Sequence, residues 1–325
     1  MNVMTEAFVP AARRQVSERD FFLPLAIIGG LILLVCTLGA HFAVGAFDQA
    51  SAERERVLAR NGIAQRIGEV AQMVVPQTVW DDATQHLDAH FDPAWAQDNI
   101  GKYLNVTSGF DDAFVVDADD RLVYASRFGR RAPMTSWRPV APLAAPLVKS
   151  VRAMEARRGP ITRTTPGQMV SKAIQSSALK IVDGKVSVLT ATLVQPDFGT
   201  VLPAGPRSPI VVTTMYIDQP FLDLFASRYM LHDLHVHPLG KPVAAGEIAI
   251  PAIDEHGRTI ATFTWHPLDP GYLMLRRMAL PLSLVCLVLT GLAFVQLRKI
   301  HAAARQLLDL QAFYEGDEAV AMRGF

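Results

Sequence analysis

Residues 110–126 read FDDAFVVDADDRLVYAS and predict a β-hairpin. A short apolar run, Ala113 to Val116, precedes the acidic turn Asp117 to Asp120, and a second strand is expected from Arg121 to Ala125. Apolar runs that flank a cluster of turn-forming aspartates are typical of antiparallel strands joined by a short connection. This hairpin decides the fold class, because most of the sequence that follows it also predicts strands.

Downstream of the hairpin, the sequence alternates several strands with a few helices. Strands are expected where β-branched residues gather, and Asp183-Gly184 fits a two-residue hairpin turn between two of them. Residues 197–209 are rich in glycine and proline and predict a surface loop. The expected strands are 177–182, 186–193, 210–217 and 235–238, with more strands within 247–265, and the expected helices are 147–157 and 220–229.

Upstream of the hairpin, the sequence is helical. Apolar positions recur near the helical period from Gln49 to Val75, without a proline, and predict one long helix. Pro76 interrupts the pattern, which resumes through Leu87, and Asp92 is the expected N-cap of a further helix to about Leu104. A long helix, a helix pair and a mostly antiparallel sheet together predict an α+β fold.

Two uncharged apolar runs enclose this α+β region. Half of the 325 residues are hydrophobic, and the excess lies in residues 21–47 and 278–297. Each run reaches the roughly 20 residues that a helix needs to cross a bilayer. Ala40 and Ala43 could imitate a signal-peptide cleavage site, but the first run exceeds the usual apolar core of a signal peptide, so a retained anchor is expected.

Basic residues at the outer flanks of the two runs indicate the orientation. The positive-inside rule places both termini in the cytoplasm, and Arg276 and Arg277, which oppose this, can extend toward the interface. The flanking residues are Arg13, Arg14 and Arg19 before the first run and Arg298, Lys299 and Arg305 after the second. The expected organisation is a cytoplasmic N-terminus (1–20), a transmembrane helix (21–47), an external domain (48–277), a second transmembrane helix (278–297) and a cytoplasmic segment (298–325).

Composition argues against cysteine chemistry in the external part and against a nucleic-acid partner. Cys36 and Cys286 both lie in the apolar runs, so the external part has no cysteine as a nucleophile, a disulfide partner or a metal ligand. The net charge is zero and there is no long basic tract, so a nucleic-acid partner is not expected. The chain also has no phosphate loop, G-x-S-x-G elbow or H-E-x-x-H motif, and no cofactor is expected.

Clustered carboxylates and histidines are the remaining candidates for catalysis. Asp81-Asp82 and Asp111-Asp112 are adjacent pairs, and neighbouring residues on a helix point about 100° apart, so neither pair converges. His235 and His237 would share one face of a strand, a spacing that metal ligands use, with His232 and Asp233 nearby. This spacing matches no closed zinc motif. A membrane-anchored metal-dependent hydrolase built on the three histidines is therefore the alternative hypothesis.

Three motifs in order carry a family resemblance. The runs VVPQTVWDDATQHL, WAQDNIGKYL and FDDAFVVDADDRLVYAS resemble the fourth class of CHASE domains, which are extracytoplasmic input domains of bacterial receptors. The matching positions are Trp80, Asp81, Asp82, Trp95, Asn99, Tyr103, Phe114 to Asp117 and Val123 to Ala125. Asp120 stands where the hairpin of the family usually has glycine, a departure that a residue tolerant of the left-handed conformation can absorb.

The resemblance implies a fold and a site. The implied fold is a Cache/PAS-like, mostly antiparallel sheet on a long N-terminal helix, in a multi-pass protein of the bacterial inner membrane. Ligands in that fold sit between the sheet and the helices that cover it. The residues expected to bind a small ligand are Trp80, Asp81, Asp82, Trp95, Asn99 and Tyr103.

Similar domains are found on diguanylate cyclases, c-di-GMP phosphodiesterases and histidine kinases. Here only 28 residues follow Leu297, too few for such an output domain, so the chain itself is not expected to be an enzyme. Within them, residues at spacings of three and four predict the seam of a short coiled coil and hence a homodimer. The seam residues are Ile300, Ala303, Leu307, Leu310 and Tyr314.

The favoured hypothesis is a receptor fragment. Its external domain would sense a small ligand or envelope condition and pass a conformational signal across the bilayer, either as the truncated input module of a c-di-GMP signalling protein or through a cytoplasmic partner. The alternatives are the metal-dependent hydrolase and a structural interaction module of the envelope.

Overall fold

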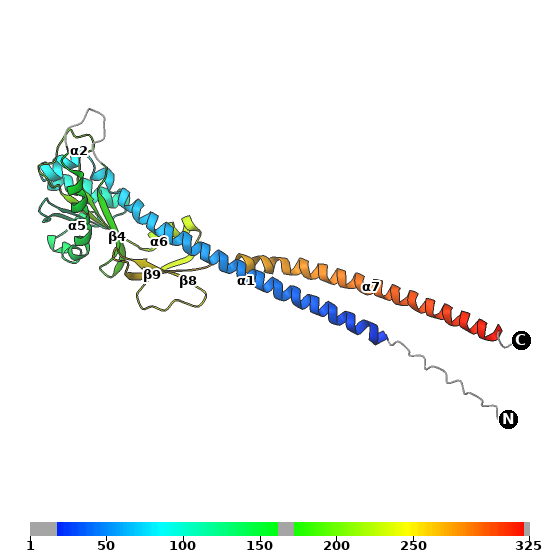
Figure 1. Cartoon of the computed structure of the whole chain (residues 1–325). Coiled ribbons are helices and arrows are strands. Elements are labelled where there is room, and N and C mark those ends of the chain that lie inside the picture. Colours follow the sequence, from blue (N-terminus) through cyan, green and yellow to red (C-terminus); the bar gives the residue numbers. More distant parts are fainter. Residues whose placement is uncertain (1–17, 162–171, 322–325) are drawn as a thin grey trace, which may run out of the picture. The chain divides into compact units, whose positions relative to one another are not determined.

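The computed structural model describes residues 18–161 and 172–321, so the predicted flanking residues Arg13 and Arg14 lie outside the described residues. The chain divides into two compact units, one formed by residues up to Ala50 with those from Asp269 onward, the other by Ser51–Leu268. The expected α+β class and the long N-terminal helix are confirmed (Figure 1).

The bounds of the elements follow the chain order. The α-helices are α1 (Glu18–Gln72), α2 (Asp81–Ala83), α3 (Pro93–Trp95), α4 (Tyr103–Ser108), α5 (Ala141–Arg158), α6 (Gln219–Tyr229) and α7 (Pro270–Ala321). The short 3₁₀ or π segments are η1 (Val75–Gln77), η2 (Thr84–Ala89), η3 (Ala96–Lys102) and η4 (Met134–Trp137). The strands are β1 (Asp112–Val116), β2 (Leu122–Arg127), β3 (Arg130–Arg131), β4 (Gln175–Val182), β5 (Lys185–Leu193), β6 (Ile210–Tyr216), β7 (His232–Pro238), β8 (Ile248–Ile253) and β9 (Thr259–His266).

The main sheet has six strands in the order β3-β2-β1-β6-β5-β4, and every pairing within it is antiparallel. The predicted hairpin is confirmed as β1 and β2, and Asp120 in its turn has a left-handed φ of 64°, as its place in the motif predicts. Asp183 and Gly184, both with positive φ, form the predicted two-residue turn between β4 and β5.

Strand alternation gives this sheet two buried faces. On one face, α5 buries Ala144, Leu147 and Val151 against residues such as Phe114 and Leu189. On the other, the helical segment before β1 buries residues such as Leu87, Ile100 and Leu104 against Val115 and Val211. Because successive strand residues point to opposite faces, the apolar runs of β1, β5 and β6 serve both layers.

A second sheet closes the larger unit. Its three antiparallel strands follow the order β7-β9-β8. They pack in one core with α6 and with the part of α1 that follows Ala50. Gly62 of α1 permits this close packing, because a Cβ atom there would lie 2.5 Å from the ring of Tyr229. The buried Trp265 donates its indole N–H to Glu55 of α1 at 3.1 Å. The helix therefore continues into the core of the domain.

The structure corrects two boundaries and the number of sheets. The long helix ends at Gln72 and not near Val75. The closing strands form a second sheet, where the sequence predicted one. Helix α5 begins at Ala141, six residues earlier than predicted, with Pro146 inside it. One proline removes a single backbone hydrogen bond, and burial of the neighbouring apolar side chains offsets that loss.

The smaller unit contains the two apolar runs. They lie in α1 and α7, and both helices are long and apolar enough to cross a membrane. Asp48 of α1 accepts hydrogen bonds from the amides of Gly271 (2.7 Å) and Tyr272 (3.2 Å) in the first turn of α7. The predicted seam residues Leu310 and Tyr314 belong to the α7 backbone, but their side chains lie outside the described part.

Candidate functional site

The first aspartate of the Trp-Asp-Asp triplet holds a distant loop in place. The buried Asp81 carboxylate accepts hydrogen bonds from the amides of Gly199 (3.0 Å) and Thr200 (2.7 Å) and from the Thr200 hydroxyl. In return, Asp197 accepts a bond from the Asp81 amide at 2.9 Å. Burial would raise the pKa of Asp81, but the bonds from Thr200 and Gly199 outweigh it and hold the pKa below its usual value. Asp81 is therefore a charged anchor of the loop.

This loop, residues 197–209, is fastened at two further points. The Ala204 amide donates to the Asp88 carboxylate of η2 at 3.2 Å. At the end of the loop, the Ser208 amide donates to Glu155 of α5 at 2.7 Å. The loop thus joins the helical segment on one face of the main sheet to the helix on the other face.

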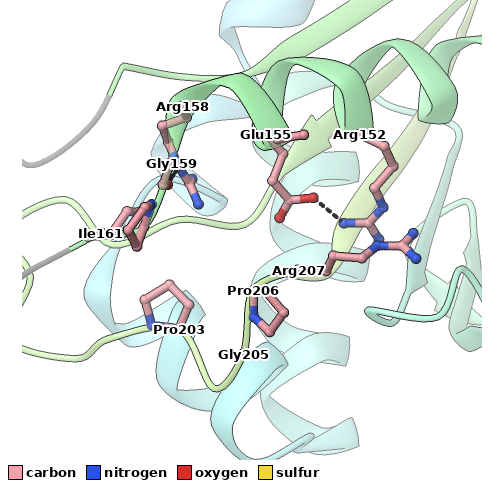
Figure 2. Close-up of a pocket in the computed structure, with 11 residues that line it drawn as sticks. Arg152, Glu155, Arg158, Gly159, Ile161, Pro203, Gly205, Pro206 and Arg207 are labelled. Atoms are coloured by element: carbon pink, nitrogen blue, oxygen red, sulfur yellow. Dashed lines mark hydrogen bonds and ion pairs between the residues drawn. The ribbon is translucent and has the colours of Figure 1, made fainter.

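A cavity of about 800 Å³ lies between the C-terminal part of α5 and the 197–209 loop (Figure 2). This volume is within the range of small-molecule sites. Its charged lining consists of Arg152, Glu155 and Arg158 from α5 and Arg207 from the loop. In Figure 2, Arg158 lies at one end of this lining and Arg152 with Arg207 at the other.

A dense ion network occupies the Arg152 end. Arg152 donates to Asp120 (3.0 Å), to Glu155 (2.8 Å) and to the Asp117 carbonyl (3.0 Å). Asp120 also accepts a bond from Arg207 at 2.6 Å. Glu155 is only 4% exposed, and its bonds to Arg152 and Ser208 replace the water that burial removes. The cations at this end of the cavity are largely neutralised by the protein itself.

The Arg158 end is different. Arg158 donates to the amide oxygen of Gln195 at 2.7 Å and to the Gly159 carbonyl at 3.3 Å, and both acceptors are neutral. Among the residues that the structure describes, no carboxylate lies within ion-pair distance of Arg158. Partial burial lowers the pKa of its guanidinium, and the nearby charge of Glu155 opposes that shift. Arg158 is thus a partly desolvated cation without a counter-ion in the described chain.

The segment that contains this site matches a known family. Residues 62–237, more than half of the chain, match the CHASE4 domain. The chain belongs to the CHASE4 family. CHASE4 is a family of sensory domains, so the resemblance expected from the sequence is confirmed. No curated protein matches the chain.

The CHASE4 domain brings together three of the six predicted ligand-binding residues, namely Trp80, Asp82 and Trp95. The Trp95 indole N–H donates to Asp82 at 3.0 Å, and the centroids of the two tryptophan rings are 5.8 Å apart. His86 stacks on Trp95 at 5.4 Å with nearly parallel rings, and its Nδ1 lies 3.4 Å from the Asp92 carboxylate. Asp92 is also the N-cap of α3, as predicted. The result is a partly buried aromatic cluster with two carboxylates at its edge.

The other three predicted residues of the CHASE4 domain have separate positions. Asp81 points to the 197–209 loop, Asn99 donates to the Trp95 carbonyl at 3.1 Å, and Tyr103 is 40% exposed on α4. None of the six residues lines the cavity beside α5. Ligand binding by the six residues stays a prediction.

The second aspartate pair, Asp111 and Asp112, connects strands of the main sheet. Asp112 is buried on β1 and accepts hydrogen bonds from Arg127 at 2.9 Å and from the Tyr216 hydroxyl at 3.3 Å. Burial raises the pKa of Asp112, although Arg127 opposes it, and burial with the Asp112 charge raises the pKa of Tyr216 to about 12. Asp111 accepts from the Tyr216 amide at 2.7 Å. These contacts tie β1, β2 and β6 together.

The histidine group lies on β7, at an edge of the small sheet. His235 and His237 share a face as predicted, with ring centroids 5.9 Å apart, while His232 pairs with His266 across a bulge at Asp233. Within the part of the chain that the structure describes, no three His, Cys, Asp or Glu side chains are placed to hold a metal ion. The geometry therefore offers the metal-hydrolase hypothesis no specific support.

The candidate site residues that the sequence did not predict are the arginines around the cavity. Residues 197–209 predict a surface loop, and no motif in the sequence marks Arg207 or Arg158. The available signal was the spacing of Arg152 and Glu155, because residues three apart on a helix are neighbours. Nothing local in the sequence indicates that Asp81 and Thr200, which are far apart in the chain, meet.

Proposed function

We propose that the chain is a bacterial membrane sensor whose CHASE4 domain lies outside the cytoplasm, binds a small ligand and passes a conformational signal through α1 and α7. The observation that supports this most is the order of elements: one apolar helix precedes a sensory domain and another follows it. Each of the two helices has the length and composition of a membrane span.

Signal transfer is supported by the way α1 enters the domain. Ala59 and Val70 of α1 are buried in the domain core, and Gly62 lies directly against Tyr229 of α6. A change in domain packing therefore alters the environment of α1. The mechanism requires at least two states that the ligand stabilises to different extents.

Several finer points belong to the same proposal. A Cache/PAS-like assignment is supported by an antiparallel sheet with its first hairpin beside the last strand and a helix over one face. Cytoplasmic termini rest on the flanking basic residues. A homodimer, a cytoplasmic signalling partner and a link to c-di-GMP rest on the heptad spacing and the family resemblance. The bilayer itself is the remaining proposed partner.

Topology is the first test. In a chain with Cys36 and Cys286 replaced by alanine, Thr107→Cys in the domain and Ala302→Cys in α7 each add one exposed thiol outside the predicted seam. In intact cells with a permeable outer membrane, an impermeant maleimide should label the Thr107→Cys variant and spare Ala302→Cys until the inner membrane is opened. Equal labelling of both in intact cells would contradict the proposed orientation.

Ligand binding is the second test. The full chain in detergent is screened by thermal shift against neutral, cationic and anionic small molecules. A sensor should be stabilised by at least one of them, because a ligand that binds only the native state raises Tm. A protein that no compound stabilises would fit the structural interaction module instead.

A further inference from the structure

We propose that the cavity between α5 and the 197–209 loop binds a small organic anion, and that Arg158 pairs with its carboxylate or phosphate group. This inference rests on the proposed sensory function and names the ligand class and the place of binding. The cavity lies beyond the C-terminal end of the apolar layer between α5 and the sheet, which is filled by side chains such as Leu147 and Val151.

Arg158 is the residue whose charge is available to a ligand. Within the described part of the chain its acceptors are the Gln195 amide oxygen and the Gly159 carbonyl, which carry no formal counter-charge. A planar guanidinium offers five N–H donors in a geometry that matches carboxylate and phosphate oxygens. Because the group is partly desolvated, an anion that replaces water beside it gains a stronger interaction than at an open surface.

The other charged groups that line the cavity are also compatible with an anionic ligand. Glu155 is already bonded to Arg152 and to the Ser208 amide, so it is not aimed at a ligand as a free carboxylate. Arg207 bonds Asp120 through one terminal nitrogen, and Asp120 is also bonded to Arg152. Among the described residues that line the cavity, no free carboxylate therefore opposes an anion at Arg158.

The rest of the lining indicates an organic body. Ala156, Pro160, Ile161, Pro203 and Pro206 contribute apolar walls. Sites for small molecules typically combine a mainly apolar lining with a few polar groups that fix orientation. A compact molecule with one anionic group and an apolar body matches this lining better than an inorganic ion.

A ligand in the cavity would change the position of the 197–209 loop, and the loop would pass that change to the end of α1. Pro203 and Pro206 of the loop form one wall, and the same loop is bonded to Asp81 through Gly199 and Thr200. Asp81 follows the short η1 turn at the end of α1. Asp81 thus acts as a positioning residue between the cavity and the helix, without contact to the ligand.

The test compares anions with neutral molecules of the same shape. The full chain in detergent is titrated with benzoate, phenyl phosphate and benzamide, and with hexanoate and hexanamide, by calorimetry and by thermal shift. We expect at least one anion to bind, and its neutral amide counterpart to bind about tenfold or more weakly, because a charge-assisted hydrogen bond is lost. Benzoate against phenyl phosphate distinguishes a carboxylate site from a phosphate site.

Variants locate the site. Arg158→Gln should weaken anion binding about ten- to a hundredfold, and Arg158→Lys should retain the preference for anions with reduced affinity, because lysine keeps the charge but not the planar fork. Arg157→Gln is the matched control: Arg157 is in the same last turn of α5, is exposed, and bonds only the Ala153 carbonyl among the described residues. Anion binding to Arg157→Gln should equal that of the wild type.

The inference is wrong if no anion in the set binds better than its neutral counterpart, or if Arg158→Gln binds anions as well as the wild type. Should Arg158→Gln fail to fold, equal binding of benzoate and benzamide to Arg158→Lys contradicts it. If no anion binds but a neutral or cationic compound stabilises the wild type, the anion proposal ends and the sensor function stands. If no compound of any charge binds, the sensor function fails as well.

Discussion

Arg152 and Arg158 lie six residues apart on the same helix, yet the two ends of the cavity that they define are built differently. At one end, Arg152 is bonded to Asp120, Glu155 and backbone carbonyls, and little of its charge is free. At the other, the acceptors that bond Arg158 among the described residues are neutral oxygens. Identical side chains can therefore stabilise the fold or remain available for binding, and the difference lies in the partners.

The largest effect should come from breaking the paired end. Arg152→Ala leaves the buried Glu155 carboxylate without its main counter-charge and frees the end of the 197–209 loop. Removing one partner of a buried ion pair costs about 3–5 kcal/mol, so we expect the free energy of unfolding to fall by that order. Denaturant unfolding of the full chain in detergent measures it.

A double variant provides the control for that prediction. Arg152→Leu with Glu155→Leu removes both charges and should be less destabilised than Arg152→Ala alone, since no unpaired charge remains. If the single and double variants lose equal stability, the cost arises from lost packing, and the electrostatic account of this end is wrong.

Asp81→Ala should have the next largest effect, because it removes the anchor at the opposite end of the loop. Hydrogen bonds to a charged group are worth about 1.5–3 kcal/mol, and we expect a stability loss of about 2 kcal/mol. Hydrogen exchange at Gly199 and Thr200 should become faster. Asp82→Ala is the matched control: the neighbouring carboxylate is 44% exposed and should leave these amides protected.

The same anchor predicts a pH dependence. The folded pKa of Asp81 is lowered, so its contribution to stability is present above the unfolded pKa of about 3.9 and is lost as the pH falls through the folded value. Protection of the Thr200 amide in the wild type should therefore decrease in acid, below about pH 4. Asp81→Asn should show weak protection at every pH. Unchanged wild-type protection in acid would contradict the anchor role.

Arg158→Gln should change stability much less than Arg152→Ala. Glutamine can still bond a neutral oxygen, and the lost charge has no carboxylate partner in the described chain. We expect a change below about 1 kcal/mol. A loss as large as that of Arg152→Ala would erase the distinction between the two ends of the cavity.

Tyr103→Ala should have the smallest effect. The side chain is well exposed on α4, and exposed substitutions typically stay within about 0.5 kcal/mol. A thermal shift of several degrees would show that Tyr103 packs more strongly than its exposure indicates.

Local patterns predicted most of the fold. The hairpin, the strands that became β4, β5 and β6, the Asp92 cap and the left-handed Asp120 were all predicted from nearby residues, because period, capping and turn chemistry act over a few positions. The predicted start of α5 was wrong, because burial of the neighbouring side chains stabilises a helix that contains Pro146. Propensity rules for single residues do not include that burial.

The candidate site was harder to predict, because its residues are brought together by tertiary contacts between segments far apart in the chain. Trp80, Asp82 and Trp95 meet as a short-range cluster, and the motif placed them together. The contact of Asp81 with Thr200 spans well over a hundred positions, and the cavity requires α5 and the 197–209 loop to face one another. Such placement depends on sheet order, which no local pattern in this sequence specifies.

The bond from Asp48 to the first turn of α7 gives the helix pair a fulcrum. Gly271 leaves no room for a side chain there, since a Cβ atom would lie 2.9 Å from the Asp48 carboxylate, so the two helices are tied closely at that point. A change in the angle between them is then small at the tie and grows with distance along each helix. From Asp48 back to Glu18 the helix is about 45 Å long, so a tilt of about 3° displaces its far end by about 2 Å. Because the two helices are held together at Asp48, a small change in the angle between them produces a larger displacement of their far ends.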